Sequence, residues 1–190
     1  MYDFTEPLSI ETLAIRAGQR RTAESEHSDP IFATSSFVFD NAADAAAKFS
    51  GATEGNVYSR FTNPTVRGFE DRLAAMEGGR FAIATASGMS AILCLVLSVL
   101  KAGDRVAVSE NVFGSTVSLF TKTLSRFGVT TDFVALTDLS AWQRAMSPRT
   151  RLLFVETPSN PTCEIADLAS LSKIAKEAGV LFVVDNVYCT

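Results

Sequence analysis

Histidine and cysteine are scarce in this sequence. Its 190 residues include one histidine, His27, and three cysteines, Cys94, Cys163 and Cys189, which are widely spaced and form no C-x-x-C pair. A histidine-dependent catalytic triad or a zinc site needs more of these residues, or closer clusters of them. The odd number and wide spacing of the cysteines favour buried free thiols in a reducing compartment. His27 stands in the polar stretch RRTAESEHSDP, which favours a solvated loop residue.

Blocks of like charge and long apolar segments are lacking too. The net charge of −4 arises from 17 basic and 21 acidic residues whose signs are interspersed. Nucleic acids and anionic membranes are therefore not favoured partners. The N-terminus has neither the basic start nor the apolar core of a signal peptide. The longest apolar stretch, 91–100, is too short to span a bilayer. We expect a soluble, cytoplasmic protein.

Strand-like and helix-like segments alternate from residue 81 to residue 185. The predicted strands are 81–86, 105–109, 130–136, 151–156 and 180–185. The predicted helices are 63–79, 87–100, 115–128, 137–147 and 167–179. Because these strands are apolar on both faces, they belong inside a parallel sheet that helices cover on both sides. The sequence therefore predicts an α/β fold with a mostly parallel sheet.

The N-terminal part of the chain lacks this regular alternation of strand-like and helix-like segments. A short helical pattern at 10–17 is joined to polar loops and to the alanine-rich stretch NAADAAAKFSG. We therefore predict an extended arm at 1–60 and an α/β domain at 61–190. The first helix of that domain has Asn63 as its cap and Pro64 at its first position. Its predicted core-facing residues are Val66, Phe69, Leu73 and Met76.

A candidate phosphate site follows the first predicted strand. Ligands of open α/β sheets bind beyond the carboxyl ends of the strands. Here Ser87, Gly88 and Met89 open a helix at such an end. Free N–H groups, the helix dipole and a serine hydroxyl all suit a phosphate, and a glycine lets the backbone approach it. An ordinary serine-capped helix start is the alternative.

Three more residues follow strands at the same edge. Asp185 ends a buried strand, where a carboxylate needs a cation or several hydrogen-bond donors. A protonated pyridine nitrogen is one such cation. The alternative roles for Asp185 are helix capping and metal binding. Phe113 could lie flat on a ring or belong to the core. Asn160 stands between two prolines, which would either hold its amide in a fixed direction or form a turn without a ligand. Together they describe a site for a flat, charged, phosphorylated ring. A dinucleotide site is disfavoured, because no G-x-G-x-x-G follows a strand.

Five sequence blocks carry a resemblance to a known family. They are NVYSRFTNPTV, ATASGMSAI, FGST, ETPSNP and VVDN, in this order. With them, the chain from Glu11 onward resembles the Cys/Met metabolism family of pyridoxal phosphate enzymes, which have the fold of type I transferases. The resemblance implies pyridoxal 5'-phosphate as the cofactor and no metal.

The resemblance also implies a role for each site residue. Ser87, Gly88 and Met89 would hold the cofactor phosphate. Phe113 would stack on the pyridine ring, Asn160 would bind the ring hydroxyl oxygen, and Asp185 would pair with the ring nitrogen. Tyr58 and Arg60 would reach the phosphate of a neighbouring subunit, in a dimer with shared sites or a tetramer.

Departures from the family pattern narrow the implied activity. Phe113 stands where most members have tyrosine, as in the sulfhydrylase branch, and Ser115 stands where methionine γ-lyases have cysteine. The lysine of the family's Ser-x-Thr-Lys motif, which forms the Schiff base, would lie beyond residue 190. The lysines present are Lys48, Lys101, Lys122, Lys173 and Lys176. None of them follows a strand, so no catalytic residue is assigned, and we expect the α/β domain to be incomplete at its C-terminal end.

The implied reaction is a γ-replacement of methionine biosynthesis, in which O-succinylhomoserine and sulfide give homocysteine and succinate. Two alternatives stay open. One is another activity of the family, such as that of a cystathionine γ-synthase or lyase. The other is a catalytically inert chain that lacks the Schiff-base lysine. The acyl group, the sulfur donor and the order of the oligomer also stay open.

Overall fold

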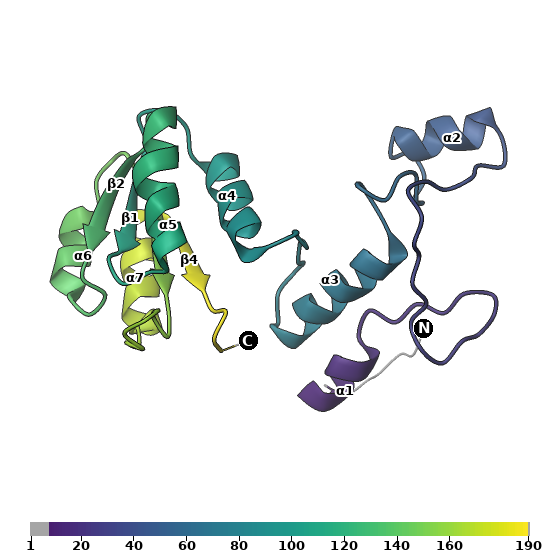
Figure 1. Cartoon of the computed structure of the whole chain (residues 1–190), viewed down its shortest axis with the longest axis horizontal. Helices are drawn as coiled ribbons and strands as arrows, with labels where there is room; N and C mark the ends of the chain where they lie inside the picture. Colours follow the sequence, from purple (N-terminus) through teal and green to yellow (C-terminus); the bar gives the residue numbers. More distant parts are fainter. Residues whose placement is uncertain (1–7, 190) are drawn as a thin grey trace. The chain divides into compact units, whose positions relative to one another are not determined.

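A computed structural model describes residues 8–189, which form two compact units that divide between Ala84 and Thr85. The second unit contains a four-stranded sheet in the order β2-β1-β3-β4, and each neighbouring pair of strands is parallel (Figure 1). The strands are β1 (Arg105–Ser109), β2 (Thr130–Val134), β3 (Thr150–Glu156) and β4 (Leu181–Asp185). The helices are α4 (Gly88–Val99), α5 (Gly114–Ser118), η1 (Leu119–Thr123), η2 (Leu124–Phe127), α6 (Leu139–Ala145) and α7 (Leu168–Ala178).

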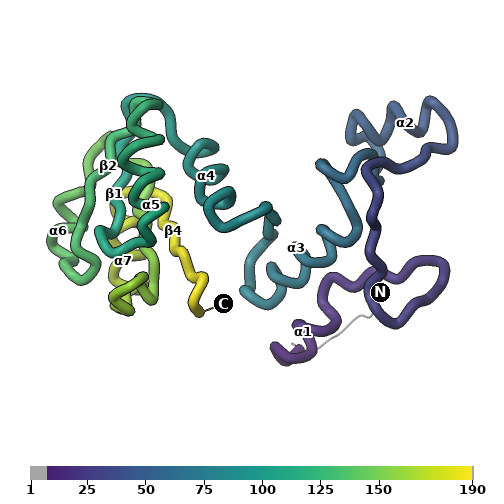
Figure 2. The backbone as a smooth tube through the Cα atoms, viewed as in Figure 1, coloured from purple at the N-terminus to yellow at the C-terminus, as the bar shows by residue number. Residues whose placement is uncertain are grey.

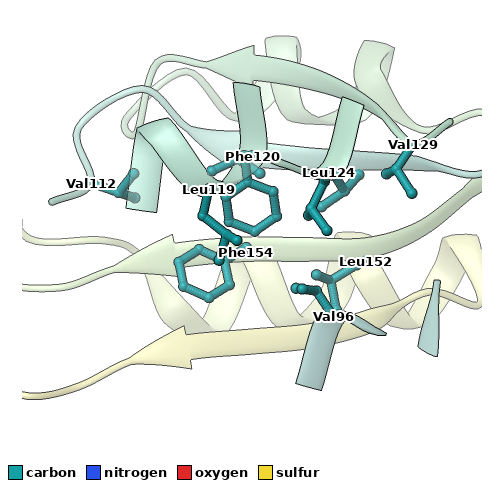
Figure 3. Close-up of a cluster of buried hydrophobic side chains, with 10 residues drawn as sticks. Val96, Val112, Leu119, Phe120, Leu124, Val129, Leu152 and Phe154 are labelled. Carbon is teal, nitrogen blue, oxygen red and sulfur yellow. The ribbon is translucent and has the colours of Figure 1, made fainter. Parts of the chain in front are cut away.

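One face of the sheet is covered by α4 and by the helical stretch from α5 to η2. Side chains alternate along a strand, so Val108 of β1 and Phe154 of β3 point to this face, where they pack with Val96 of α4 and Phe120 of η1. The rings of Phe120 and Phe154 lie 5.4 Å apart between their centres (Figure 3). Each buried side chain of this kind stabilises the fold by about 2 kcal/mol.

The other face is covered by α6 and α7. Ala107 of β1 and Leu153 of β3 pack there with Trp142 of α6 and Leu171 of α7. Trp142 is fully buried, and its Nε1–H donates to the carbonyl oxygen of Leu136 at 3.2 Å. Helices on both faces of a parallel sheet confirm the predicted α/β fold.

Local sequence signals explain where α6 and α7 begin and end. The side chain of Asp138 accepts the Ala141 N–H at 2.9 Å, and that of Asp167 accepts the Ser170 N–H at 3.0 Å, so each aspartate caps a helix N-terminus. Gly179 ends α7 in the left-handed region, with φ of 65°, where glycine has no steric penalty. Figure 2 shows β4, in yellow, leading toward the C-terminal end of the chain.

The predicted helix 115–128 is helical but not uniform. It begins as α5, loosens to π-type turns in η1 and tightens to a 3₁₀ turn in η2. Gly128 closes it in the left-handed region, with φ of 75°. The Thr121 hydroxyl donates to the Val117 carbonyl oxygen at 2.8 Å within the stretch where the hydrogen-bond register changes.

The predicted strand 81–86 is wrong. This segment is extended but belongs to no strand, and Phe81 and Ile83 are 72% and 75% exposed. A strand is stabilised by hydrogen bonds to a neighbouring strand, and the sheet formed by the described residues does not include this segment. The Ala84 N–H donates instead to the Glu70 carboxylate at 2.8 Å.

The first unit contains α1 (Ile10–Arg16), α2 (Ala42–Phe49) and α3 (Pro64–Met76). Asn63 caps α3 as predicted, with its side chain accepting the Thr65 N–H at 2.9 Å. The predicted core face of α3 is not buried within residues 8–84, since Val66, Phe69 and Met76 are 42%, 56% and 37% exposed. The described part of the unit therefore leaves this face of α3 open. The boundary between arm and domain at residue 60 stays a prediction.

The three cysteines are free thiols, but their predicted burial is wrong, because all three are exposed. Cys94 is on α4, where its neighbours Leu93 and Val96 contact the core and it does not. None of the helices in residues 8–189 has the length and hydrophobicity that a membrane crossing requires.

Candidate functional site

The carboxyl ends of β1, β3 and β4 bring predicted site residues to one edge of the second unit. In the parallel sheet these ends meet at the same edge. Asp185 ends β4, Phe113 follows β1, and Asn160 follows β3. The structure thus places these three residues on neighbouring strand exits.

Asp185 is an acid that pairs with no cationic side chain among residues 8–189. Its side chain is half-buried, and its Oδ1 accepts the Val187 N–H at 3.3 Å. None of the ion pairs formed by residues 8–189 includes Asp185. Its register partner on β3 is another acid, Glu156. A cationic ligand group bound at this edge would therefore pair with Asp185 and stabilise its charge. None of the described cationic side chains plays that part.

Glu156 is a site residue that the sequence did not predict. It is 1% exposed at the end of β3, and its two carboxylate oxygens accept different backbone N–H groups. Oε2 accepts the Phe113 N–H at 2.7 Å, and Oε1 accepts the Asn160 N–H at 3.0 Å. Burial raises the pKa of Glu156, and the charge of Asp185 raises it further, whereas the two N–H donors lower it. The only sequence signal was an acid at the end of a buried strand, within the block ETPSNP.

Phe113 and Met89 line one open pocket of about 590 Å³, although Met89 is on α4 and Phe113 is on the loop after β1. Phe113 is 46% exposed and directly precedes α5. Met89 lies in the first turn of α4, and its sulfur faces the Thr116 hydroxyl at 3.8 Å. Ser115 lines the same pocket. An aromatic ring with this exposure is open to stacking by a flat ligand.

The N-terminus of α4 has the form that the phosphate prediction requires. Ser87 caps the helix by accepting the Ser90 N–H at 3.2 Å. The N–H groups of Gly88 and Met89 follow in the first turn, where an α-helix provides no acceptor of its own. A Cβ at Gly88 would meet no atom of the described chain within 4 Å. This opening leaves room for an anion against the backbone.

Asn160 is held at both its backbone and its side chain. Besides the bond to Glu156, its Nδ2 donates to the Tyr188 hydroxyl at 3.0 Å. An amide nitrogen carries two hydrogens, so a second hydrogen remains for another acceptor. Tyr188 is 60% exposed and was not predicted as a site residue.

Tyr58 and Arg60 lie together on the loop before α3, in the first unit. The Arg60 guanidinium carbon lies 5.7 Å from the centre of the Tyr58 ring and 4.5 Å from that of Phe61. Both Tyr58 and Arg60 are exposed, and no ion pair within residues 8–189 includes Arg60. The pair thus exposes a hydroxyl and a guanidinium, and their binding of a phosphate stays a prediction.

None of the five lysines, all of which the structure describes, follows a strand at the sheet edge. Lys48 is on α2, Lys101 is in a turn, Lys122 is on η1, and Lys173 and Lys176 are on α7. Lys122 differs from the others because it lines the pocket that contains Phe113. The sequence had not indicated this placement.

Comparison with known proteins identifies the family. The family model described as Cys/Met metabolism PLP-dependent enzyme matches residues 11–190. The chain belongs to this family. Enzymes of this family depend on pyridoxal phosphate. The features above suit that group: an acid without a cationic partner among the described residues for a ring nitrogen, an exposed aromatic for its face, and an open helix N-terminus for its phosphate.

Relatives in this family are sulfhydrylases and lyases. The O-succinylhomoserine sulfhydrylase of Pseudomonas aeruginosa is 58% identical over 97% of this chain and 46% of its own length. That of Mycobacterium tuberculosis is 42% identical over 96% and 45%. The L-methionine gamma-lyase of Pseudomonas putida is 40% identical over 85% and 40%. The chain thus spans about half the length of the curated relatives it matches.

Solved structures of the family share the fold. A proposed O-acetylhomoserine (thiol)-lyase from Campylobacter jejuni, which contains a pyridoxyl-lysine phosphate, matches with a TM-score of 0.90 and 35% identity over 94% of this chain and 44% of its own. The cystathionine gamma-lyase of Lactobacillus plantarum matches with a TM-score of 0.85 and 32% identity over 94% and 45%. These matches confirm the predicted type I fold.

Proposed function

We propose that this chain is the N-terminal, cofactor-binding part of a sulfhydrylase that converts O-succinylhomoserine and sulfide into homocysteine and succinate, in the methionine biosynthesis of the cytoplasm. Sulfide replaces succinate at the γ-carbon, so a carbon–sulfur bond forms where a carbon–oxygen bond breaks. The 58% identity to an O-succinylhomoserine sulfhydrylase supports this substrate pair over the lyase activities. Ser115, where methionine γ-lyases carry cysteine, supports the same choice.

The cofactor assignment rests on one observation above all. Asp185 presents an unmatched carboxylate at the sheet edge where Phe113 is exposed. Pyridoxal phosphate, when bound, supplies an electron sink for carbanions formed on the substrate. Asp185 would hold a proton on the ring nitrogen, which strengthens that sink. Phe113 would cover one face of the ring and exclude water from it.

The remaining residues would hold and orient the cofactor. The N–H groups of Gly88 and Met89 and the Ser87 hydroxyl would bind its phosphate. The second amide hydrogen of Asn160 would bind its ring hydroxyl oxygen. The lysine that forms the Schiff base would come from outside these 190 residues, so the chain alone would not turn over substrate.

The protein would assemble from copies of this chain. In that assembly residues 1–60 would form an arm, and Tyr58 and Arg60 would bind the phosphate of the neighbouring subunit. A guanidinium can bind two phosphate oxygens at once, and arginine suits such a contact for this reason. The exposed apolar face of α3 is consistent with contact between subunits.

The decisive experiment uses the complete gene product. Purified protein is incubated with pyridoxal phosphate, O-succinylhomoserine and sulfide, and homocysteine and succinate are measured. We expect the two products in equal amounts, and far less turnover with O-acetylhomoserine. Release of a 2-oxo acid without sulfide would favour a lyase, and no turnover with any homoserine ester would contradict the proposal.

A further inference from the structure

We propose that Glu156 is a positioning residue for the cofactor ring: its carboxylate joins the loops after β1 and β3, and so holds Phe113 and Asn160 in register with each other. The inference rests on the proposed function, because it assumes that both residues contact pyridoxal phosphate. Glu156 itself would not touch the reacting atoms.

The two hydrogen bonds tie together loops that come from different strands. Phe113 follows β1 and Asn160 follows β3, and the two strands are neighbours in the sheet. One carboxylate at the end of β3 reaches both loops, with one oxygen for each N–H, at 2.7 Å and 3.0 Å. A cofactor ring would stack on Phe113 and bind Asn160 at its edge. Glu156 would therefore fix the position of both contacts relative to each other.

At the Phe113 end of this connection, Glu156 is the hydrogen-bond acceptor. Phe113 occupies the position before the first turn of α5, and its own side chain makes no capping hydrogen bond. Glu156, on another strand, accepts the N–H of Phe113 itself at 2.7 Å. Without Glu156, this partly buried N–H would lose its acceptor, which is costly.

A buried carboxylate is an expensive way to accept two hydrogen bonds, and the cost argues for a role beyond packing. Glu156 is 1% exposed and lies in register with the acid Asp185. An apolar residue would fill the same space without placing two carboxylates side by side. What only a carboxylate offers here is two acceptor oxygens at a fixed separation.

Two variants separate this role from a simple effect of charge. Glu156→Gln keeps the shape but places an NH₂ group, which cannot accept, opposite one of the two N–H groups. Glu156→Asp keeps the charge but shortens the side chain by about 1.5 Å, so it reaches neither N–H well. If placement matters, both variants are impaired, whereas if only the negative charge matters, the aspartate variant behaves like the wild type.

Thr150→Val is the matched control. Thr150 is 2% exposed at the other end of β3, and its hydroxyl donates to the Ala145 carbonyl oxygen at 3.1 Å and accepts the Ser147 N–H at 3.1 Å. This variant also loses buried hydrogen bonds on the same strand, but far from the sheet edge that carries Asp185. It reports what a loss of stability alone does to the cofactor.

Three measurements are made on the complete gene product: the dissociation constant for pyridoxal phosphate, the visible circular dichroism band of the bound cofactor, and hydrogen exchange in peptides that contain Phe113 or Asn160. We expect both Glu156 variants to raise the dissociation constant about tenfold, because each leaves a partly buried N–H unpaired. We also expect them to weaken the dichroism band and to speed exchange in both peptides, and Thr150→Val to do none of these.

The outcomes separate this inference from the proposed function. If the wild type binds the cofactor and either Glu156 variant keeps the wild-type dichroism band and affinity, the positioning role is wrong and the proposed function stands. If Thr150→Val weakens the band equally, the effect is one of stability and the positioning role is again wrong. If the wild type binds no pyridoxal phosphate, both proposals are wrong.

Discussion

Replacing Asp185 by asparagine is expected to make the cofactor-free protein more stable while removing most of its affinity for pyridoxal phosphate. Asparagine keeps the shape of the side chain and the oxygen that accepts the Val187 N–H. It removes the charge that lies in register with Glu156, another carboxylate, which is 1% exposed. Without a bound cation, the two acids repel each other across neighbouring strands.

The size of this repulsion follows from the spacing of the sheet. Neighbouring strands lie about 4.8 Å apart, and two like charges about 5 Å apart repel by about 3 kcal/mol at an effective dielectric constant of about 20. Asp185 is partly exposed, so solvent reduces the figure to between about 1 and 3 kcal/mol. Each kcal/mol corresponds to about 2–4 °C in melting temperature for a domain of about this size.

The effect has a predictable dependence on pH. The raised pKa of Glu156 means that its charged form is disfavoured in the folded protein. The cost of that charge to folding is absent below the ordinary pKa of a glutamate, grows as the pH rises from there, and is complete above the raised pKa of Glu156. The stability advantage of Asp185→Asn should therefore grow with pH and disappear in acid.

Thermal unfolding of the complete gene product, with and without pyridoxal phosphate and at several pH values, measures both effects. Loss of a charged hydrogen bond to the ring nitrogen should weaken cofactor binding by about tenfold to a hundredfold. A cofactor-free Asp185→Asn protein that melts below the wild type at neutral pH would refute the repulsion. Unchanged cofactor affinity would refute the pairing of Asp185 with the ring.

Three further predictions test other parts of the site. Gly88→Ala should leave the fold intact or slightly more stable, since helices favour alanine by up to about 1 kcal/mol and the added Cβ meets no atom of the described chain within 4 Å. The same variant should weaken cofactor binding. Unchanged affinity in a titration would mean that the start of α4 is an ordinary capped helix N-terminus and not a phosphate site. Arg60→Ala should weaken cofactor binding without unfolding the protomer. Mixing this variant with a Ser87→Ala variant should restore activity, because each mixed dimer would contain one intact site. If no activity is restored, Arg60 acts in its own subunit. The 190-residue chain expressed alone should elute as an oligomer or aggregate in size-exclusion chromatography and give no pyridoxyl adduct after borohydride. A stoichiometric adduct on one lysine would show that the chain contains its own Schiff-base residue. Lys122 is the first lysine to examine.

The second unit was largely predictable from sequence because its signals are local. Four of the five expected strands form, since each combines an apolar run with turn residues at both ends. Asp167 and Gly179 mark the two ends of α7 through short-range hydrogen bonding and backbone freedom. Asp185, Phe113 and Asn160 were placed correctly at one edge, because the carboxyl ends of parallel strands must meet there.

The failures share one cause, which is dependence on distant partners. The apolar pattern of 81–86 is that of a strand, but a pattern does not supply the neighbouring strand that makes it one. The same holds for the face of α3, where Val66 and Phe69 have helical spacing but stay exposed in the described chain. Cys94 was expected to be buried because cysteine often is, but its side of α4 has no covering element among residues 8–189.

Glu156 shows why a site can be recognised from sequence while one of its supports is missed. An acid after a buried strand has the same sequence signal whether its side chain points to a ligand, to solvent or into the protein. Asp185 and Glu156 end neighbouring strands in the same register, yet one is open to a ligand and the other is enclosed by two backbone N–H groups. Those donors belong to loops 43 and 4 residues away along the chain, and backbone N–H groups carry no side-chain identity that a sequence could reveal. The role of a residue that acts through the backbone of others is seen only in the three-dimensional structure. For this reason the sequence indicates Phe113 and Asn160, which are expected to touch the cofactor, but not Glu156, which binds the backbone of both.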